Sequence, residues 1–311
     1  MPHRTTSRLI RTTTLRQLQI LLAVVKHGSY TRAAEALHLT QPTVSMQVRK
    51  LADNIGHPLF ETSSRGLTLT LAGRRTVAAA EEIFQRLELL GSDINAILGE
   101  VKGELRVGVV TTAKYFMPHL LGAFIQRYPE VTPRLTVTNR AAVLERLADH
   151  RDDLLIMGRV PQGLEVEAHA FLDNDLVVAA PAGHPLARRR AIPLTRLLEE
   201  RLLVREPGSG TRLAMEKLFR QYNLEPEPYM ELGSIEAIKQ GVMAGLGISV
   251  MSRHNLRLEL ETGRICLLDV KGFPLRRHWF AVHPANRKPN LVAQSFLDFL
   301  LHEGADLLDR D

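Results

Sequence analysis

The side chains that could do chemistry in this chain are hydroxyl, amide and basic groups gathered in four short stretches. These are "TQPTVSMQVRK" (40–50), "VVTTAKY" (109–115), "VTNRAAV" (137–143) and "REPGSGTR" (205–212). Groups of these types recognise anions and base edges through hydrogen bonds and charge. No Ser/His/Asp order, nucleophile elbow or metal-ligand spacing is visible, although the chain has twelve histidines. The chemistry indicated is therefore binding, and an enzyme built on the later part of the chain is the competing class.

The first stretch must be positioned by helices that we expect between residues 15 and 55. Thr14 and Gln17 have the spacing of a capping box, and Ser29 can cap a second helix after the break at Gly28. Thr40 is the expected cap of a third helix, with Pro42 in its first turn. Two short helices joined by the turn at 38–40 are typical of a unit that holds one helix against a DNA major groove.

The third helix has one apolar and one polar face. The apolar residues recur at helical spacing, and we expect them to be buried: Val44, Val48, Leu51 and Ile55. The opposite face carries groups able to read base edges or touch phosphates, namely Gln41, Pro42, Ser45, Met46, Gln47, Arg49 and Lys50. An ordinary helical hairpin is the alternative interpretation.

A β-hairpin is predicted directly after these helices. In "PLFETSSRGLTLTLAGR" (58–74), Leu59 and Phe60 anchor one strand, residues 67–69 form the other, and "SSRG" is turn chemistry. Arg65 at the tip could enter a minor groove. The helices and hairpin together predict a winged DNA-binding module.

The charge distribution supports a polyanionic partner for this module. Residues 1–70 hold nine Lys/Arg and three Asp/Glu, a net charge of +6, whereas residues 71–311 hold 31 of each sign. All of the excess positive charge therefore lies in the first quarter of the chain, which is typical of nucleic-acid binding.

A single long helix is predicted over residues 70–99. Apolar residues follow a seven-residue seam, and those that we expect at a dimer interface are Val77, Phe84, Leu87, Ile94 and Leu98. Packing of this helix on its own domain is the alternative.

From residue 103 onward, strand-like and helix-like segments alternate, which predicts an α/β unit with a mainly parallel sheet and two lobes. Ligands of such sheets bind at the carboxyl ends of strands. The candidate ligand-binding residues at those ends are Thr111, Thr112, Lys114, Asn139, Arg140, Arg205, Ser209, Gly210, Thr211 and Arg212. Taken alone, "GSGT" is more often a plain helix cap.

Other features limit the class of protein. The chain has one cysteine, Cys266, which we interpret as a core thiol and which fits a reducing cytoplasm. No apolar run reaches the length of a membrane span, and the first residues lack the apolar segment of a signal peptide.

The N-terminal residues also carry a family resemblance. The run "LRQLQILLAVVKHGSYTRAAEALHLTQPTVSMQVRKLADNIGHPLFE…LTLAGR" resembles the winged helix-turn-helix of LysR-type transcriptional regulators. With this resemblance, the predicted DNA-contacting residues are Tyr30, Thr31, Arg32, Gln41, Pro42, Thr43, Ser45, Met46, Gln47, Arg49, Lys50 and Arg65. The chain departs from the family pattern at Met46, where Arg is frequent, and at Thr62, where a basic residue is frequent.

The resemblance implies an overall α/β architecture. It consists of an N-terminal winged helix-turn-helix (12–70), a long linker and dimerisation helix (71–102) and a C-terminal two-lobed periplasmic-binding-protein-like effector module (103–311). Lobe 1 would cover about 103–174 and 280–311, and lobe 2 about 175–279. The implied assembly is a homodimer or a dimer of dimers.

The effector module has a narrower resemblance. "VVTTAKYFMPHLLGAF", "RLADHRDDLLIMG", "FLDNDLVVAAP", "REPGSGTR" and "ELGSIEAIKQGVMAGLGISVMSRH" are similar to the regulators of the RuBisCO operon in Calvin–Benson–Bassham carbon fixation. This implies a cytoplasmic activator that binds double-stranded promoter DNA and responds to a phosphorylated metabolite. Ribulose bisphosphate, phosphoenolpyruvate and NADPH are the effectors it suggests, and no other cofactor or metal is expected. A LysR-type regulator of another operon, with a different small anionic effector, is the alternative.

Overall fold

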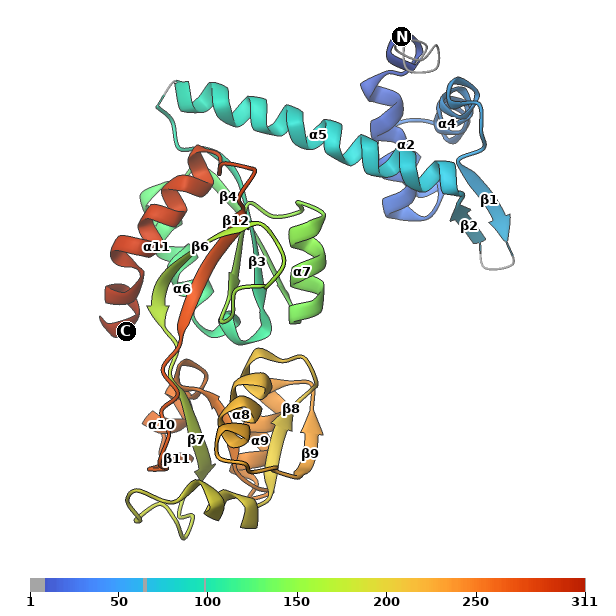
Figure 1. The fold of residues 1–311 in the computed structure, drawn as a ribbon. Helices are drawn as coiled ribbons and strands as arrows, with labels where there is room; N and C mark the ends of the chain where they lie inside the picture. The colour runs from blue at the N-terminus through green and yellow to red at the C-terminus, as the bar shows by residue number, and fades with distance from the viewer. Residues whose placement is uncertain (1–8, 64–65, 98, 311) are drawn as a thin grey trace. The chain divides into compact units, whose positions relative to one another are not determined.

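The computed structural model describes residues 9–63, 66–97 and 99–310 of the 311-residue chain. It is organised as two compact units that divide between Gly91 and Ser92, within one long helix. Figure 1 shows the elements of both units, which are considered separately below.

The N-terminal unit is a three-helix cluster followed by a β-hairpin and the start of a long helix. Its elements are α2 (Leu15–His27), α3 (Tyr30–Ala36), α4 (Gln41–Ile55), β1 (Phe60–Ser63), β2 (Gly66–Leu69) and α5 (Leu71–Ile97). The two strands are antiparallel, with Phe60 opposite Leu69. The predicted helices and wing strands are confirmed.

Two of the three predicted helix caps are present. Thr14 and Gln17 form a reciprocal capping box, and the Ser29 hydroxyl accepts a hydrogen bond from the Arg32 amide. Thr40 occupies the N-cap position of α4, but its side chain caps nothing. Its hydroxyl lies 2.8 Å from that of Thr43 instead. The prediction of a Thr40 side-chain cap was therefore wrong, because a nearby hydroxyl takes the place of the backbone amide.

The apolar face of α4 forms the centre of this unit. Val44, Val48 and Leu51 are buried, and Ile55 packs at the edge of the same core. The wing is attached to this core through Phe60, whose ring meets that of Tyr30 edge-on at a centroid distance of 5.9 Å. Burial of the aliphatic face fixes which side of α4 points outward.

The first part of helix α5 packs on the N-terminal core, whereas its later part is exposed. Val77, Ala80 and Phe84 pack against the core that contains Leu51. Val77 and Phe84 are thus partly covered by their own domain, and their place in a dimer interface stays a prediction. Further along, Leu87, Leu90, Ile94 and Ile97 are exposed, and Leu98 lies outside the described residues.

The first lobe of the C-terminal unit is a five-stranded sheet between helices. Its strands, in spatial order, are β4 (Val131–Thr138), β3 (Gly103–Val110), β5 (Leu154–Met157), β12 (His278–Pro284) and β6 (Val166–Asp173). Helices α6 (Met117–Arg127) and α11 (Leu291–Arg310) cover one face, and α7 (Arg140–Ala148) covers the other. Trp279 on β12 is 1% exposed in the larger of the two cores.

The second lobe has two smaller sheets. One contains β10 (Ser249–Ser252), β7 (Leu176–Pro181) and β11 (Ile265–Leu268), and the other contains β8 (Leu202–Arg205) and β9 (Pro228–Leu232). The helices are α8 (Gly210–Gln221), α9 (Ile235–Met243) and α10 (Arg257–Glu261), with 3-10 turns at Leu194–Glu199 and Arg253–Leu256. Helices α8 and α9 pack on separate apolar cores.

Two chain segments cross between the lobes, residues 174–175 and 275–277. The chain leaves lobe 1 along β6 and returns along β12, so these neighbours are antiparallel, whereas β4, β3 and β5 are parallel. In lobe 2, β7 is antiparallel to both of its neighbours. The prediction of a mainly parallel sheet was therefore wrong: both lobes are mixed, because strands that return from the opposite lobe enter in the reverse direction.

Two further expectations can be compared with this fold. Cys266 is half-buried in β11, where its thiol contacts the Pro181 carbonyl at 3.2 Å and burial raises its pKa, as fits a core thiol. Over the described part of the chain, no helix combines the length and apolar character that crossing a membrane requires.

The junction of wing and α5 yields a stability prediction. The Thr70 hydroxyl accepts a hydrogen bond from the Gly73 amide and donates one to the Pro58 carbonyl. These two bonds hold the first turn of α5 close to the backbone that precedes β1. A Cβ added at Gly73 would lie 2.0 Å from the Leu59 carbonyl oxygen. Gly73→Ala should therefore destabilise the N-terminal unit by about 1–3 kcal/mol through overpacking.

The measurement is hydrogen–deuterium exchange of the α2 and α4 amides, which should speed up in Gly73→Ala. Gly91→Ala is the matched control, because a Cβ at that helical position meets no atom within 4 Å. The control should keep or slightly gain protection, since alanine has the higher helix propensity. Equal exchange in the two variants would contradict the close approach at Gly73.

Candidate functional site

The outward face of α4 is the first candidate surface. Gln41, Pro42, Ser45 and Met46 are exposed there, as are Arg49 and Lys50 one turn further on. The buried stripe of Val44, Val48 and Leu51 lies on the other side of the same helix. This face therefore presents amide, hydroxyl and basic groups, as the sequence predicts.

Three predicted residues of this surface have structural contacts as well. The Gln47 side-chain oxygen accepts a bond from Gln17 on α2, so this amide is tied to its own domain. Tyr30 is half-buried against Phe60, and burial raises the pKa of its hydroxyl. Thr43 is half-buried beside Thr40. Thr31 and Arg32 are exposed on α3, and Arg65 lies outside the described residues.

The second candidate site is a small cavity between the two lobes of the C-terminal unit, which we call the effector cleft. Its volume is about 40 Å³. It is lined by Val110, Thr111, Thr112, Arg140, Gly158, Arg159, Asn174, Arg205, Glu206, Ser209, Gly210, Thr211, Arg277 and Trp279. Seven of the ten predicted ligand-binding residues thus meet at one place.

Strand ends and helix starts place these groups. Thr111 and Thr112 open a 3-10 turn (Thr111–Tyr115) directly after β3, and Arg140 is the first residue of α7. Ser209 occupies the N-cap position of α8, but its hydroxyl makes no capping hydrogen bond. Because Ser209 is buried and lines the cleft, the plain helix-cap interpretation of "GSGT" does not describe its side chain.

Arg277 joins the two lobes. Its guanidinium donates to the Gly158 carbonyl of lobe 1 at 2.6 Å and to the Gly210 carbonyl of lobe 2 at 2.9 Å. A Cβ added at Gly158 would lie 2.8 Å from the side-chain nitrogen of Asn174, so a larger residue there would require Asn174 to move. A single side chain on a crossing segment therefore ties both walls of the cleft.

Positive charge accumulates around this bridge. The Arg140 guanidinium donates to the Arg159 carbonyl at 2.7 Å, and no ion pair of Arg140, Arg159 or Arg277 with a described carboxylate is present. Burial and the neighbouring Arg159 lower the pKa of Arg140. Burial, with Arg159 and Arg140, also lowers that of Arg277. An anion placed here would raise both pKa values again, because it stabilises the charged guanidinium groups.

The cleft also contains buried polar groups without partners. Neither the Trp279 indole nitrogen nor the Asn174 side-chain oxygen has a hydrogen-bond partner among the described residues. Both residues are buried and line the cleft. A buried indole N–H without an acceptor is costly, so a ligand oxygen or a water is the expected partner.

Arg205 is not a free counter-charge. Its guanidinium makes two bonds to the Glu206 carboxylate, at 2.7 and 2.8 Å, and one to the Thr111 hydroxyl at 3.2 Å. Four arginines and one glutamate are among the described residues of the cleft, so its lining has a formal charge of +3. Arg205 neutralises that glutamate and links the end of β8 to lobe 1.

Three predicted ligand-binding residues lie outside the cleft lining, so their role in ligand binding stays a prediction. The Arg212 side chain runs along α8 to Glu216 and across to Glu231, which together raise its pKa. Asn139 caps α7 by accepting from the Ala142 amide. The Lys114 ammonium lies over the Tyr115 ring, 5.1 Å from its centroid. Each of these side chains has a contact outside the cleft, although it lies close to cleft residues in the sequence.

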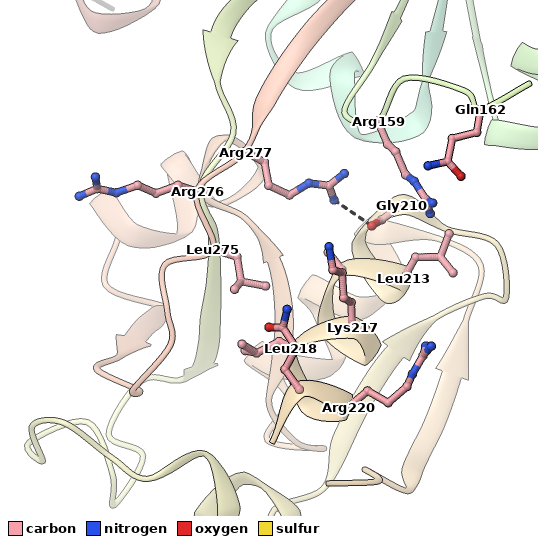
Figure 2. A pocket seen from close by; sticks show the side chains of 12 residues that line it. Arg159, Gln162, Gly210, Leu213, Lys217, Leu218, Arg220, Leu275, Arg276 and Arg277 are labelled. Carbon is pink, nitrogen blue, oxygen red and sulfur yellow. Dashed lines mark hydrogen bonds between the residues drawn. The ribbon is translucent and has the colours of Figure 1, made fainter. Parts of the chain in front are cut away.

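A larger cavity of about 600 Å³ adjoins the effector cleft and shares Arg159, Gly210 and Arg277 with it. Figure 2 shows this cavity, with the Arg277–Gly210 hydrogen bond at its border and Lys217 and Arg220 along α8. Arg276 extends to the opposite side from Arg277. The surroundings of the cleft are therefore also cationic.

Sequence reasoning missed several cleft residues: Gly158, Arg159, Asn174, Arg277 and Trp279. Gly158 and Arg159 follow β5 directly, so the strand-end rule applied to "LLIMGR" would have found them. Asn174 and Arg277 lie on the segments that cross between lobes, where no periodic pattern exists. Chemically, the complete arrangement can bind a small anion rich in oxygen acceptors.

Two family models match this chain. The bacterial regulatory helix-turn-helix protein of the lysR family matches residues 15–74, and the LysR substrate binding domain matches residues 98–305. Among solved structures, a CbnR, a LysR-family transcriptional regulator, shares the fold with a TM-score of 0.69 at 23% identity, covering 94% of this chain and 99% of that one.

Closer relatives cover nearly the whole chain. A RuBisCO operon transcriptional regulator of Acidithiobacillus ferrooxidans is 46% identical over 96% of both chains, and one of Allochromatium vinosum is 47% identical over 94% of this chain and 96% of that one. The regulatory domain of Synechocystis CcmR, solved in complex with 2-PG, is 44% identical, with a TM-score of 0.62, covering 64% of this chain and 96% of that one. With both of its modules matched, the chain belongs to the LysR family of bacterial transcriptional regulators.

Proposed function

We propose that this protein activates carbon-fixation genes of the RuBisCO operon and that a small phosphorylated metabolite in the effector cleft controls it. The observation that carries the effector part is the group of Arg140, Arg159 and Arg277 at one cavity, without a described carboxylate partner. The gene target is supported by relatives at 46–47% identity that are named RuBisCO operon regulators.

DNA binding would use the exposed face of α4 in a major groove. Gln41 and Ser45 would read base edges, and Arg49 and Lys50 would contact phosphates. Tyr30 and Gln47 would mainly hold the wing and α4 in place, given their contacts with Phe60 and Gln17. Arg65 remains the proposed contact of the wing.

The proposed effector is a short phosphorylated acid. 2-Phosphoglycolate is the first candidate, because the 44% identical CcmR regulatory domain was solved with 2-PG. Ribulose bisphosphate, phosphoenolpyruvate and NADPH are further candidates. The phosphate would face Arg140 and Arg159, and the hydroxyls of Thr112, Ser209 and Thr211 would supply neutral donors.

Effector binding would alter the contacts that join the lobes. An anion held by Arg140, Arg159 and Arg277 would compete with the two carbonyls for the Arg277 guanidinium. A ligand alters DNA occupancy only if it prefers one arrangement over another. Exchange of the Arg277 bridge for contacts with the ligand would provide that preference.

The proposed assembly is a homodimer through the second half of α5, with a dimer of dimers as the larger form. Leu87, Leu90, Ile94 and Ile97 are exposed on this helix, and such a stripe is typical of an unpartnered helical seam. The proposed location of the protein is the cytoplasm.

The DNA assignment is tested with Gln41→Ala and Ser45→Ala. Each should weaken binding to the RuBisCO promoter by about 1–3 kcal/mol relative to random DNA, because a base contact is lost. The measurement is fluorescence anisotropy on both DNA fragments. Gln126→Ala, an exposed residue of α6, is the control and should bind like wild type. Unchanged specificity in both α4 variants would place the base-reading groups elsewhere.

The oligomer assignment is tested with Leu87→Glu. A carboxylate buried against a partner helix is costly, so this variant should sediment as a smaller species or lose solubility. Leu258→Glu on α10 introduces the same charge at another exposed leucine and should sediment like wild type. Sedimentation velocity distinguishes the two, and an unchanged assembly in Leu87→Glu would remove α5 from the interface.

The effector assignment is tested by calorimetry with 2-phosphoglycolate, ribulose bisphosphate, phosphoenolpyruvate and NADPH. Arg140→Gln should weaken binding of the true effector by about 2 kcal/mol, roughly thirtyfold, because a charge-assisted bond is lost. Thr211→Ala should weaken it less, and both should keep effector-free DNA binding. Arg189→Gln removes one charge from an exposed loop and is the control.

Two results would contradict different parts of this proposal. Equal affinity of wild type and Arg140→Gln for a ligand that binds would place the effector outside the cleft. Binding of none of the four, with promoter binding intact, would favour a regulator of another operon with a different anion.

A further inference from the structure

Two histidines and one glutamate meet at the end of the lobe 1 sheet, away from the effector cleft. Glu167 and His169 lie two residues apart on the edge strand β6, so their side chains share a face. In the antiparallel register, His283 of β12 lies opposite Glu167, and Ala281 lies opposite His169. The pairing of strands more than a hundred residues apart thus places all three side chains together.

The distances within this cluster fit a shared cation. The Glu167 Oε2 atom lies 3.6 Å from Nε2 of His283 and 3.9 Å from Nε2 of His169. One potential ligand atom from each residue lies within 4.8 Å of the others. Ligand atoms about 2.0–2.2 Å from a tetrahedral metal lie roughly 3.4 Å apart, so small side-chain rotations suffice.

The hydrogen bonding of the two rings leaves the facing nitrogens available. Nδ1 of the buried His283 lies 3.1 Å from the Pro284 carbonyl, which can only accept, so this contact favours the neutral tautomer with N–H at Nδ1 and a lone pair at Nε2. A backbone carbonyl that fixes the tautomer in this way is common behind metal-bound histidines. His169 Nε2 is buried and has no hydrogen-bond partner among the described residues.

A plain histidine–carboxylate ion pair explains these observations less well. Both Nε2–Oε2 distances exceed hydrogen-bond length, although the rings stack only 5.6 Å apart, with 19° between their planes. A protonated imidazole would be expected to move within bonding distance of a carboxylate that is more than half exposed. Separations of this size are closer to those of three ligand atoms around one cation than to those of a direct ion pair.

We propose that Glu167, His169 and His283 bind a divalent first-row transition metal, with Zn²⁺ as the reference ion. Two imidazoles and one carboxylate suit Zn²⁺ and its neighbours better than Mg²⁺ or Ca²⁺. The exposed side of Glu167 leaves a fourth position open to water. Because β6 is an edge strand, an ion bound by residues of both strands links the end of β6 to β12 and so stabilises lobe 1.

The experiment uses the full-length protein after treatment with a chelator. Titration with Co²⁺, followed by visible absorption, should give one saturable equivalent with the spectrum of a nitrogen–oxygen site and no thiolate band. Zn²⁺ should displace Co²⁺ and raise the thermal midpoint. His169→Gln and Glu167→Gln should weaken Co²⁺ binding by about tenfold or more and abolish the thermal shift.

His278→Gln is the matched control. His278 lies on β12 and its Nδ1 atom is 3.1 Å from the carboxylate of Asp173 on β6, so it forms a histidine–carboxylate pair on the same two strands, and no third metal-ligating side chain joins it among the described residues. It should bind Co²⁺ and respond to Zn²⁺ like wild type, with circular dichroism confirming that each variant is folded. Equal Co²⁺ affinity in wild type, His169→Gln and Glu167→Gln would overturn the site, as would a loss of binding in His278→Gln alone.

Discussion

The arrangement of the C-terminal unit depends on the two hydrogen bonds of Arg277. This side chain belongs to neither lobe, yet it satisfies one carbonyl in each, at Gly158 and Gly210. Gly158 follows β5 directly and Gly210 is the first residue of α8, so the bridge joins the ends of two elements. A guanidinium suits such a bridge because its donors diverge in one plane. An ammonium also has several donors, but it lacks this fixed planar arrangement.

The same bridge explains the electrostatics of the cleft. Arg277 brings its charge beside Arg140 and Arg159, which would repel it in the absence of an anion. Two other contacts between the lobes work against that repulsion, the Arg205–Thr111 bond and the Tyr115–Glu236 bond. Polar contacts between the lobes therefore oppose the repulsion among the like charges of the cleft. An anion bound there would remove this repulsion and so shift the balance.

Sequence patterns predicted what depends on local spacing and missed what depends on pairing at a distance. The apolar stripe of α4, the capping box at Thr14 and the strand-end hydroxyls at Thr111 and Thr112 were all readable from periodicity. The direction of the Arg212 side chain could not be read from periodicity, because its partner Glu231 lies on β9 and not on α8. The proximity of His283 to His169 was equally hidden, since only the register of β6 with β12 brings the two together. Dimerisation through the second half of α5 stays a prediction, because contacts within one chain do not test it.

The position of the single tryptophan has a practical consequence. Trp279 is the only indole in the sequence, and it stands in the wall of the effector cleft with its N–H unpaired among the described residues. Indole emission is sensitive to hydrogen bonding and to nearby charge. The native chain therefore contains its own optical reporter at this cavity, with no second fluorophore of that kind to obscure it. Entry of the proposed effector should therefore change the emission of the unlabelled protein.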